Sequence, residues 1–158
     1  MTKFLLPLAA LCALALAQAQ PATPAASSPT SLPGSAAPAD DALFRALGGR
    51  PGIAAIVGDF VPRLVADPRM GEFFKKTKQA HLEEMLAQQF CVVSGGGCTY
   101  TGLPMAQAHH DMDISKGDFN ALVEVLQASM DAQHVPFATQ NRLLARLAPM
   151  HREIVNVH

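Results

Sequence analysis

Hydrophobic residues recur every three or four positions from residue 41 to the C-terminus, which places them on one face of an α-helix. Polar residues fill the positions between them. The first long run contains Ile53, Ile56, Val57, Phe60, Val61, Leu64 and Val65. Pro51 stands where the first turn of a helix needs no N–H donor, whereas Pro62 inside the run predicts a kink. Before this run, Asp41 is expected to cap a short helix that ends at Gly48-Gly49.

Three further runs show the same helical spacing. One covers residues 79–93 and is followed by three glycines. Another begins at Ser115, with Asp118 in its first turn, a pattern typical of a capped helix. The last is expected to start at Thr139 and to bury Leu143, Leu147, Met150 and Ile154. The alternation typical of strands is not present, so the sequence predicts an all-α domain over residues 41–158.

The first 40 residues have a different composition. Lys3 precedes an apolar run over residues 4–17, and Ala17-Gln18-Ala19 fits the small-x-small site of signal peptidase. This run is too short to cross a bilayer comfortably. Residues 1–19 are therefore predicted to be a cleaved signal peptide, and the Ala/Pro/Ser-rich residues 20–40 a disordered linker. The mature protein is expected to be exported to the periplasm and free of the membrane.

Charge and cysteine content narrow the classes of partner and the compartment. The net charge is -1, which offers no field for nucleic acid or anionic lipid. The small cluster of Lys75, Lys76 and Lys78 is predicted to be a solvated corner, with contact to an anionic ligand group as the alternative. Cys91 and Cys98 stay after the signal is removed, and in an oxidising compartment they are expected to form a disulfide across the glycines.

Two adjacent histidines end a short turn and a brief helical segment over residues 100–110. Adjacent helical residues point about 100° apart, so only one of His109 and His110 can face a buried site. A lone histidine is more often a core or surface residue than a ligand. The pair could also chelate copper or nickel at the surface.

The order and spacing of these features resemble those of the group one truncated haemoglobins, over nearly all of residues 41–155. The residues that carry the resemblance are Leu43 to Gly49, Asp59-Phe60, Ala66 to Arg69, Phe73-Phe74, Gly95-Gly96, Tyr100-Thr101-Gly102, Met105 and His109. The family fold is a shortened globin, in which two helix pairs enclose one haem in a two-over-two sandwich.

The resemblance implies a haem site with His109 as the proximal ligand of the iron. Haem iron takes a neutral imidazole from a fairly rigid segment, with apolar surface around the porphyrin. The chain has no Cys-x-x-Cys-His motif, so non-covalent haem b is expected. Lys75 or Lys78 could contact a haem propionate. The aromatic wall and the proximal side are predicted from Phe60, Phe74, Phe90, Met105, Met112, Ile114 and Phe119.

The opposite, distal side departs from the family pattern. Many members carry a tyrosine directly after the phenylalanine matched by Phe60, and glutamines on the next helix, where this chain has Val61, Leu82 and Leu86. These residues predict an apolar distal pocket with fast dioxygen release and comparatively strong carbon monoxide binding. Met85, next to Leu86, is a candidate sixth ligand of the iron, with a core role as the alternative.

Reversible binding of dioxygen, carbon monoxide or nitric oxide is the function that this resemblance favours. The alternatives are electron transfer or nitric oxide detoxification, which would need an unidentified electron donor, and a non-haem helical metal-binding module. The sequence offers no distal acid or base for peroxidase chemistry. No catalytic residues are assigned, and nitric oxide dioxygenation stays open as a side activity.

Overall fold

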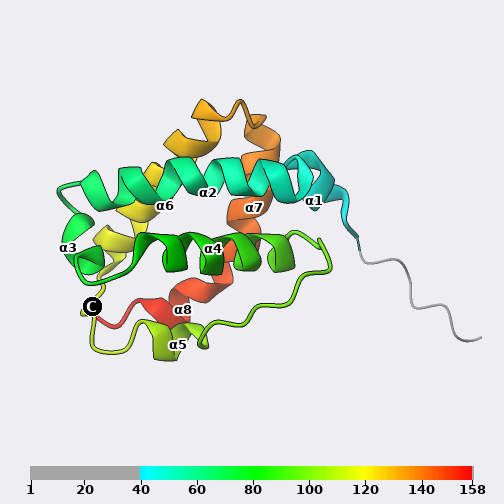
Figure 1. Cartoon of the computed structure of the whole chain (residues 1–158). Coiled ribbons are helices and arrows are strands. Elements are labelled where there is room, and N and C mark those ends of the chain that lie inside the picture. The colour runs from blue at the N-terminus through cyan, green and yellow to red at the C-terminus, as the bar shows by residue number, and fades with distance from the viewer. Residues whose placement is uncertain (1–39, 158) are drawn as a thin grey trace, which may run out of the picture. The chain divides into compact units, whose positions relative to one another are not determined.

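The computed structural model describes residues 40–157, and every regular element within this range is helical (Figure 1). The all-α prediction is confirmed. The predicted signal peptide and linker lie outside the described residues, except for Asp40. The elements are α1 (Ala42–Ala46), α2 (Gly49–Ala66), α3 (Gly71–Phe74), α4 (Gln79–Val93), α5 (Met105–Ala108), α6 (Lys116–Ala132), α7 (Phe137–Leu147), the 3-10 turn η1 (Ala148–Met150) and α8 (His151–Ile154).

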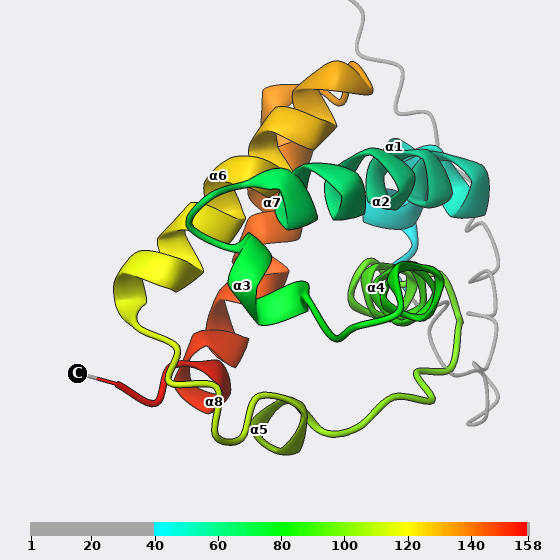
Figure 2. The same cartoon turned by 60° about the vertical axis from the view of Figure 1, so that its left-hand side comes forward.

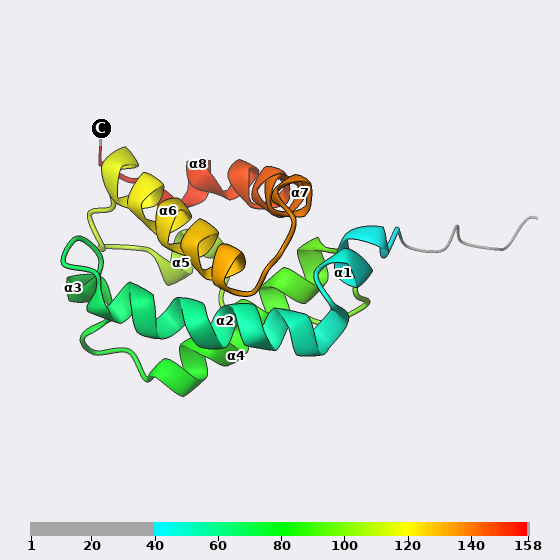
Figure 3. The same ribbon diagram turned by 90° about the horizontal axis from the view of Figure 1, so that it is seen from above.

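Helix α2 packs against both α4 and α6, and α7 lies beside α6 and α4. Figure 2, which looks nearly along α4, shows α5 below α4, with α3 to the left of α4 and α8 to the left of α5. Figure 3 shows α6 and α7 side by side above α2 and α4. The α2–α4 pair thus packs against the α6–α7 pair.

The core forms mainly where α2 packs against α4 and α6, with Leu143 of α7 joining it. Six of the seven hydrophobic residues predicted for the first long run are buried, and Val65 packs against them in part. From the other helices, Leu126, Met130 and Leu143 are at most 1% exposed. Each such side chain contributes roughly 1.5–3 kcal/mol when it is fully buried. The helical periodicity therefore identified the core correctly.

The bounds of α4 and the start of α6 agree with the sequence. Helix α6 begins with a reciprocal cap: the Asp118 N–H donates to Ser115 Oγ at 3.2 Å, and the Ser115 N–H donates to Asp118 Oδ2 at 2.9 Å. The Ser115 hydroxyl also donates to Asp118 Oδ2 at 2.7 Å, and this bond together with the one from the Ser115 N–H holds the pKa of the Asp118 carboxyl below its usual value. Within residues 40–157, none of the helices is long and apolar enough to cross a membrane.

Two local predictions were wrong in detail. Asp41 precedes α1 but its side chain pairs with Arg45 instead of capping the helix. The last helix starts at Phe137, directly after Pro136, and gives way at Ala148 to η1, whose middle residue is Pro149. A proline cannot donate to a helical hydrogen bond, so Met150 and Ile154 lie beyond this break instead of on one continuous helix. Pro62 lies inside α2, which continues to Ala66, and the kink expected there stays a prediction.

Candidate functional site

A cavity of about 350 Å³ lies between α4 and α5, within the size range of sites for small molecules and cofactors. Most of its walls are hydrophobic, and every helix except α1 contributes to them. The lining residues are Phe60, Leu64, Phe73, Phe74, Thr77, His81, Leu82, Met85, Leu86, Gln89, Phe90, Tyr100, Gly102, Leu103, Met105, Ala108, His109, Met112, Leu122, Leu126, Leu147, Met150 and Ile154.

His109 lines this cavity from the end of α5, where it is the C-terminal cap residue. Its Nδ1 lies 2.8 Å from the carbonyl oxygen of Met105. A carbonyl oxygen only accepts hydrogen bonds, so Nδ1 is the nitrogen that carries the proton. The neutral tautomer that fits this bond leaves a free lone pair on Nε2. Metal-bound histidines commonly use this arrangement, in which the second ring nitrogen donates to a carbonyl.

Several contacts tether the segment before α5 to α4. Both the N–H and the Oγ1 of Thr101 donate to Gln88 Oε1, at 2.9 and 3.0 Å. Cys91 and Cys98 form the disulfide expected from the sequence. The Tyr100 ring covers Gly102 so closely that a Cβ there would lie 2.3 Å from the phenol oxygen. Glycine at 102 therefore lets the chain turn beneath Tyr100 on its way to His109.

His110 is directed away from the cavity. Its side chain is 75% exposed, and its Nδ1 lies 2.8 Å from a carboxylate oxygen of Asp111. Among residues 40–157, no group of three or more histidine, cysteine, aspartate or glutamate side chains is placed to hold a metal ion. The geometry thus separates the two imidazoles and gives no support to a copper or nickel site shared by His109 and His110.

Most of the predicted pocket residues line the cavity. From α2 to α4 these are Phe60, Phe74, Leu82, Met85, Leu86 and Phe90, and beyond α4 they are Met105 and Met112. Ile114 and Phe119 instead line a smaller cavity of about 70 Å³, which shares His109 and Met112 with the large one. They therefore lie next to His109 without reaching the main cavity.

Val61 is a correction to the predicted distal wall. Its side chain is fully buried in the helical core and does not line either of these cavities. The neighbouring positions Phe60 and Leu64 take the cavity side of α2 instead. Adjacent residues of a helix project about 100° apart, so the rotation of α2 against α4 and α6 decides which of them reaches the cavity.

The sequence prediction also missed four polar residues of the cavity: Thr77, His81, Gln89 and Tyr100. His81 and Gln89 lie one turn before and one turn after Met85, so helical spacing from Met85 could have identified them. Gln89 Nε2 donates to the sulfur atoms of Met105 and Met150, both at 3.2 Å. Burial raises the pKa of the Tyr100 phenol. The α4 wall is therefore mixed instead of wholly apolar.

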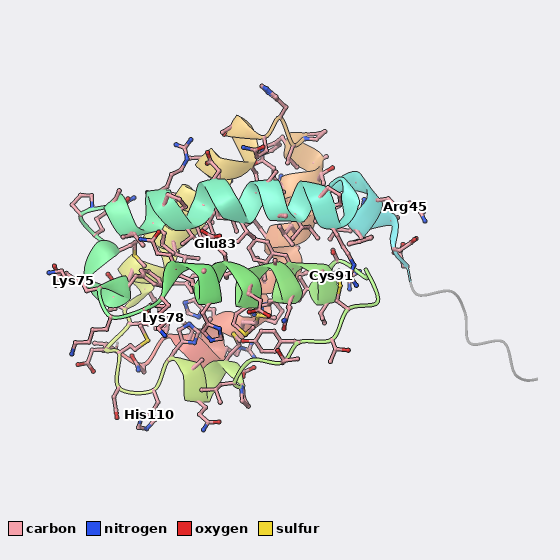
Figure 4. The ribbon with its side chains drawn as sticks, in the orientation of Figure 1. Arg45, Lys75, Lys78, Glu83, Cys91 and His110 are labelled. Atoms are coloured by element: carbon pink, nitrogen blue, oxygen red, sulfur yellow. A yellow bond between two sulfur atoms is a disulfide. The ribbon has the colours of Figure 1, made fainter. Side chains whose placement is uncertain are left out.

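The two lysines proposed for a propionate differ in their surroundings. Lys75 forms an ion pair with Glu72, and Figure 4 shows it at the outer end of the domain. Lys78 immediately precedes α4 and lies on the side of α4 that faces α5 in the same view. Neither lysine is among the residues that line the cavity, so the contact with a propionate stays a prediction.

These residues fit a haem. The cavity offers one imidazole with a free Nε2, held at the end of a short helix, and aromatic and aliphatic walls on both sides of it. Such walls bury the porphyrin, and a proximal histidine holds the iron in globins. The described residues thus supply both requirements of a haem site.

Comparison with known proteins identifies the family. The model of the bacterial-like globin family matches residues 42–156. The chain is 30% identical over 112 residues to the group 1 truncated hemoglobin GlbN of Mycolicibacterium paratuberculosis, covering 71% of this chain and 82% of that protein. It is 32% identical over 88 residues to the group 1 truncated hemoglobin of Tetrahymena thermophila, which covers 56% of this chain and 73% of the relative.

Solved structures agree with this assignment. The truncated hemoglobin from Tetrahymena pyriformis in its Fe(III) form superposes with a TM-score of 0.70 at 26% identity, over 72% of this chain and 97% of that one. The 2/2 hemoglobin from Synechococcus sp. PCC 7002 gives a TM-score of 0.68 at 22% identity, over 72% of this chain and 98% of that one, and shows the fold alone. The chain therefore belongs to the bacterial-like globin family, as a group 1 truncated haemoglobin with the haem and iron that this family implies.

Proposed function

We propose that this globin holds haem b non-covalently through His109 and binds dioxygen, carbon monoxide or nitric oxide reversibly. The observation that carries the proposal is the His109 imidazole, which lines the cavity while its Nδ1 bonds to Met105 at 2.8 Å. A bound haem would supply an iron atom that His109 holds and that can bind a diatomic gas. The absence of a Cys-x-x-Cys-His motif favours non-covalent attachment.

The chain's own residues set how tightly a gas is held. The Met105 carbonyl fixes the orientation of the His109 ring, because a hydrogen bond to Nδ1 leaves only Nε2 for the iron. Leu82 and Leu86 line the wall opposite α5 and can donate no hydrogen bond. Two polar residues of α4 also line the cavity: His81 is exposed at the start of the helix, and the Gln89 amide is engaged by two methionine sulfur atoms. A bound gas therefore meets few free donors.

The proposed gas binding is tested by adding haem to the purified protein, reducing it and titrating with carbon monoxide. Uptake of one haem per chain, followed by a shift of the Soret band that saturates at one carbon monoxide per haem, is the expected result. Failure of the protein to give a Soret band after haem addition would contradict the proposal.

Replacing Leu86 by glutamine is expected to slow dioxygen release. The new amide can donate to bound dioxygen, which carries partial negative charge, and such a bond contributes about 1–3 kcal/mol, or roughly ten- to a hundredfold in affinity. Stopped-flow displacement of dioxygen by carbon monoxide measures the dissociation rate of the wild type and of Leu86→Gln.

The matched control is Leu86→Ile, which keeps the volume without adding an N–H donor or a sulfur atom. Its dioxygen dissociation rate should stay near that of the wild type. A wild-type rate as slow as that of Leu86→Gln would show that the native pocket already supplies a donor, and would overturn the apolar distal wall.

Export to the periplasm is the second part of the proposal. Its supports are the apolar run after Lys3, the small-x-small site ending at Ala19 and the disulfide between Cys91 and Cys98. Disulfides persist in oxidising compartments and are rare in the cytosol. The intact mass of the protein from its native host should correspond to a chain that starts at Gln20. A mass that includes residues 1–19 would contradict export by cleavage.

A further inference from the structure

We infer that Met85 is an internal axial ligand of the haem iron, opposite His109, which an incoming gas has to displace. This inference rests on the proposed haem site and adds a sixth ligand and a regulation of gas binding to it. It follows from the way in which α4 and α5 face each other across the cavity.

Gln89 fixes the register between the two walls. Its Nε2 donates to Met105 Sδ in α5 and to Met150 Sδ in η1, both at 3.2 Å. These contacts place the 89 position of α4 opposite the first residue of α5. His81, Met85 and Gln89 are spaced by four residues, and residues four apart share one face of a helix. All three line the cavity, so this face of α4 is the one turned toward α5 and η1.

Helices α4 and α5 run in opposite directions in Figure 1, and both line the cavity. From the contact between Gln89 and Met105, one turn back along α4 leads to Met85. One turn forward along α5 leads to His109, whose N–H closes that turn on the Met105 carbonyl at 3.1 Å. Both steps cover four residues, or about 6 Å of helix. Met85 therefore faces His109 from the opposite wall of the same cavity.

Among the cavity residues of α4 near this position, Met85 has the side chain best suited to bind haem iron. Leu82 and Leu86, the other nearby residues of α4 in the cavity, carry no atom that can bind a metal. Methionine has a flexible side chain and a soft sulfur, and it is an axial ligand of haem iron in other proteins. His81 is the other candidate on this face. It lies two turns from Gln89, whereas Met85 lies one turn away, and its side chain is exposed.

An internal ligand changes two properties of the site. Gas binds only to the fraction of molecules in which Met85 has left the iron, so the apparent gas affinity falls in proportion to that fraction. A histidine and methionine pair also raises the reduction potential relative to a site without the thioether. Met85 thereby favours the ferrous state that gas binding requires. Because it competes with the gas for the iron, it also lowers the apparent gas affinity.

The test compares haem-loaded wild type with Met85→Leu, which keeps the volume of the side chain and removes the sulfur. The wild type should give a low-spin ferric spectrum with a sulfur-to-iron charge-transfer band in the near-infrared. Met85→Leu should be high-spin, have a lower reduction potential and bind carbon monoxide about tenfold more tightly, if Met85 is bound in roughly nine molecules of ten. His81→Ala removes the other candidate ligand on this face and should keep the low-spin spectrum, and His134→Ala, at an exposed histidine outside the cavity, is the control.

Two results would overturn the inference. One is a high-spin wild-type ferric spectrum, and the other is a low-spin spectrum that persists in Met85→Leu and disappears in His81→Ala. Either could occur while the protein still binds one haem and one carbon monoxide, in which case the gas-binding proposal stands. Loss of haem binding from the wild type is a different result and would contradict the proposed function itself.

Discussion

Among the six histidines of the chain, His109 combines a place in the main cavity with a ring orientation set by the backbone. The sequence placed it at the end of a short helical segment, and the resemblance distinguished it from His110. It could not show which ring nitrogen is free, because the bond from Nδ1 depends on the α5 turn bringing the Met105 carbonyl within 2.8 Å. The structure therefore adds the tautomer to the predicted ligand.

Tyr100 offers a residue-scale prediction, since it is the only tyrosine in a chain without tryptophan. Burial raises the pKa of its phenol, so the folded protein favours the neutral form. The corresponding contribution to stability is fully present below the unfolded pKa of about 10, and it is lost as pH rises through the higher folded value. Phenolate absorbance should therefore appear at a higher pH in the folded protein than in the denatured chain.

The blank for this titration is Tyr100→Phe, which carries the same haem absorbance without the phenol. Subtracting its spectrum at each pH isolates the single tyrosinate signal. Equal midpoints for the folded and denatured chains would contradict the burial of Tyr100 against Gly102.

At the scale of elements, the start of α6 is the local feature that the sequence predicted most completely. The side chains of Ser115 and Asp118 are close in sequence, so their mutual cap depends on little besides the local backbone. Helix α4 was predicted equally well because Gly95 begins a turn with φ of 87°, at a point where a Cβ would lie 2.3 Å from the Asp40 carbonyl oxygen. Local signals of this kind can be read directly from residue types.

Replacing Ser115 by alanine is expected to lower the free energy of unfolding by about 1 kcal/mol, because the cap on the Asp118 N–H is lost. The Ser115 contacts lower the Asp118 pKa, so their stabilisation is present above the unfolded pKa of about 4 and fades as pH falls below it. Denaturant unfolding of the wild type and of Ser115→Ala at pH 7 and near pH 3 measures both effects.

Asn120→Ala is the control for this experiment, since Asn120 is exposed on the same helix. Alanine is the better helix former, so this variant should be as stable as the wild type or slightly more stable. A Ser115→Ala protein as stable as the Asn120→Ala protein at pH 7 would contradict the capping role.

The elements that were predicted less well depend on tertiary packing. Val61 was expected in the distal wall, but the rotation of α2 turns Phe60 and Leu64 to the cavity instead. His81 and Gln89 were missed because the spacing of hydrophobic residues along α4 marks its apolar positions, whereas the cavity also takes polar ones. Hydrophobic spacing shows which face of a helix is buried, but it cannot show which buried face borders a cofactor site.

For the molecule as a whole, the cavity is a product of long-range assembly. Its lining residues come from α2 near the start of the domain and from α8 near its end, and only packing brings them together. The resemblance to truncated haemoglobins predicted this arrangement of helices. The match of the family model to residues 42–156 confirmed the family. The disulfide and the bonds between Thr101 and Gln88 then hold the segment that leads to His109 against α4.

The central claim is that His109 is the residue that ties the haem iron to this globin. The most direct measurement is a haem titration, followed by the ferrous carbon monoxide spectrum, of the wild type, His109→Ala and His110→Ala. We expect the wild type and His110→Ala to give the same Soret band and the same carbon monoxide complex, because His110 is exposed and directed toward Asp111. His109→Ala should lose the histidine-ligated spectrum, and added imidazole should restore it. A wild-type spectrum from His109→Ala, or its loss from His110→Ala, would contradict the claim.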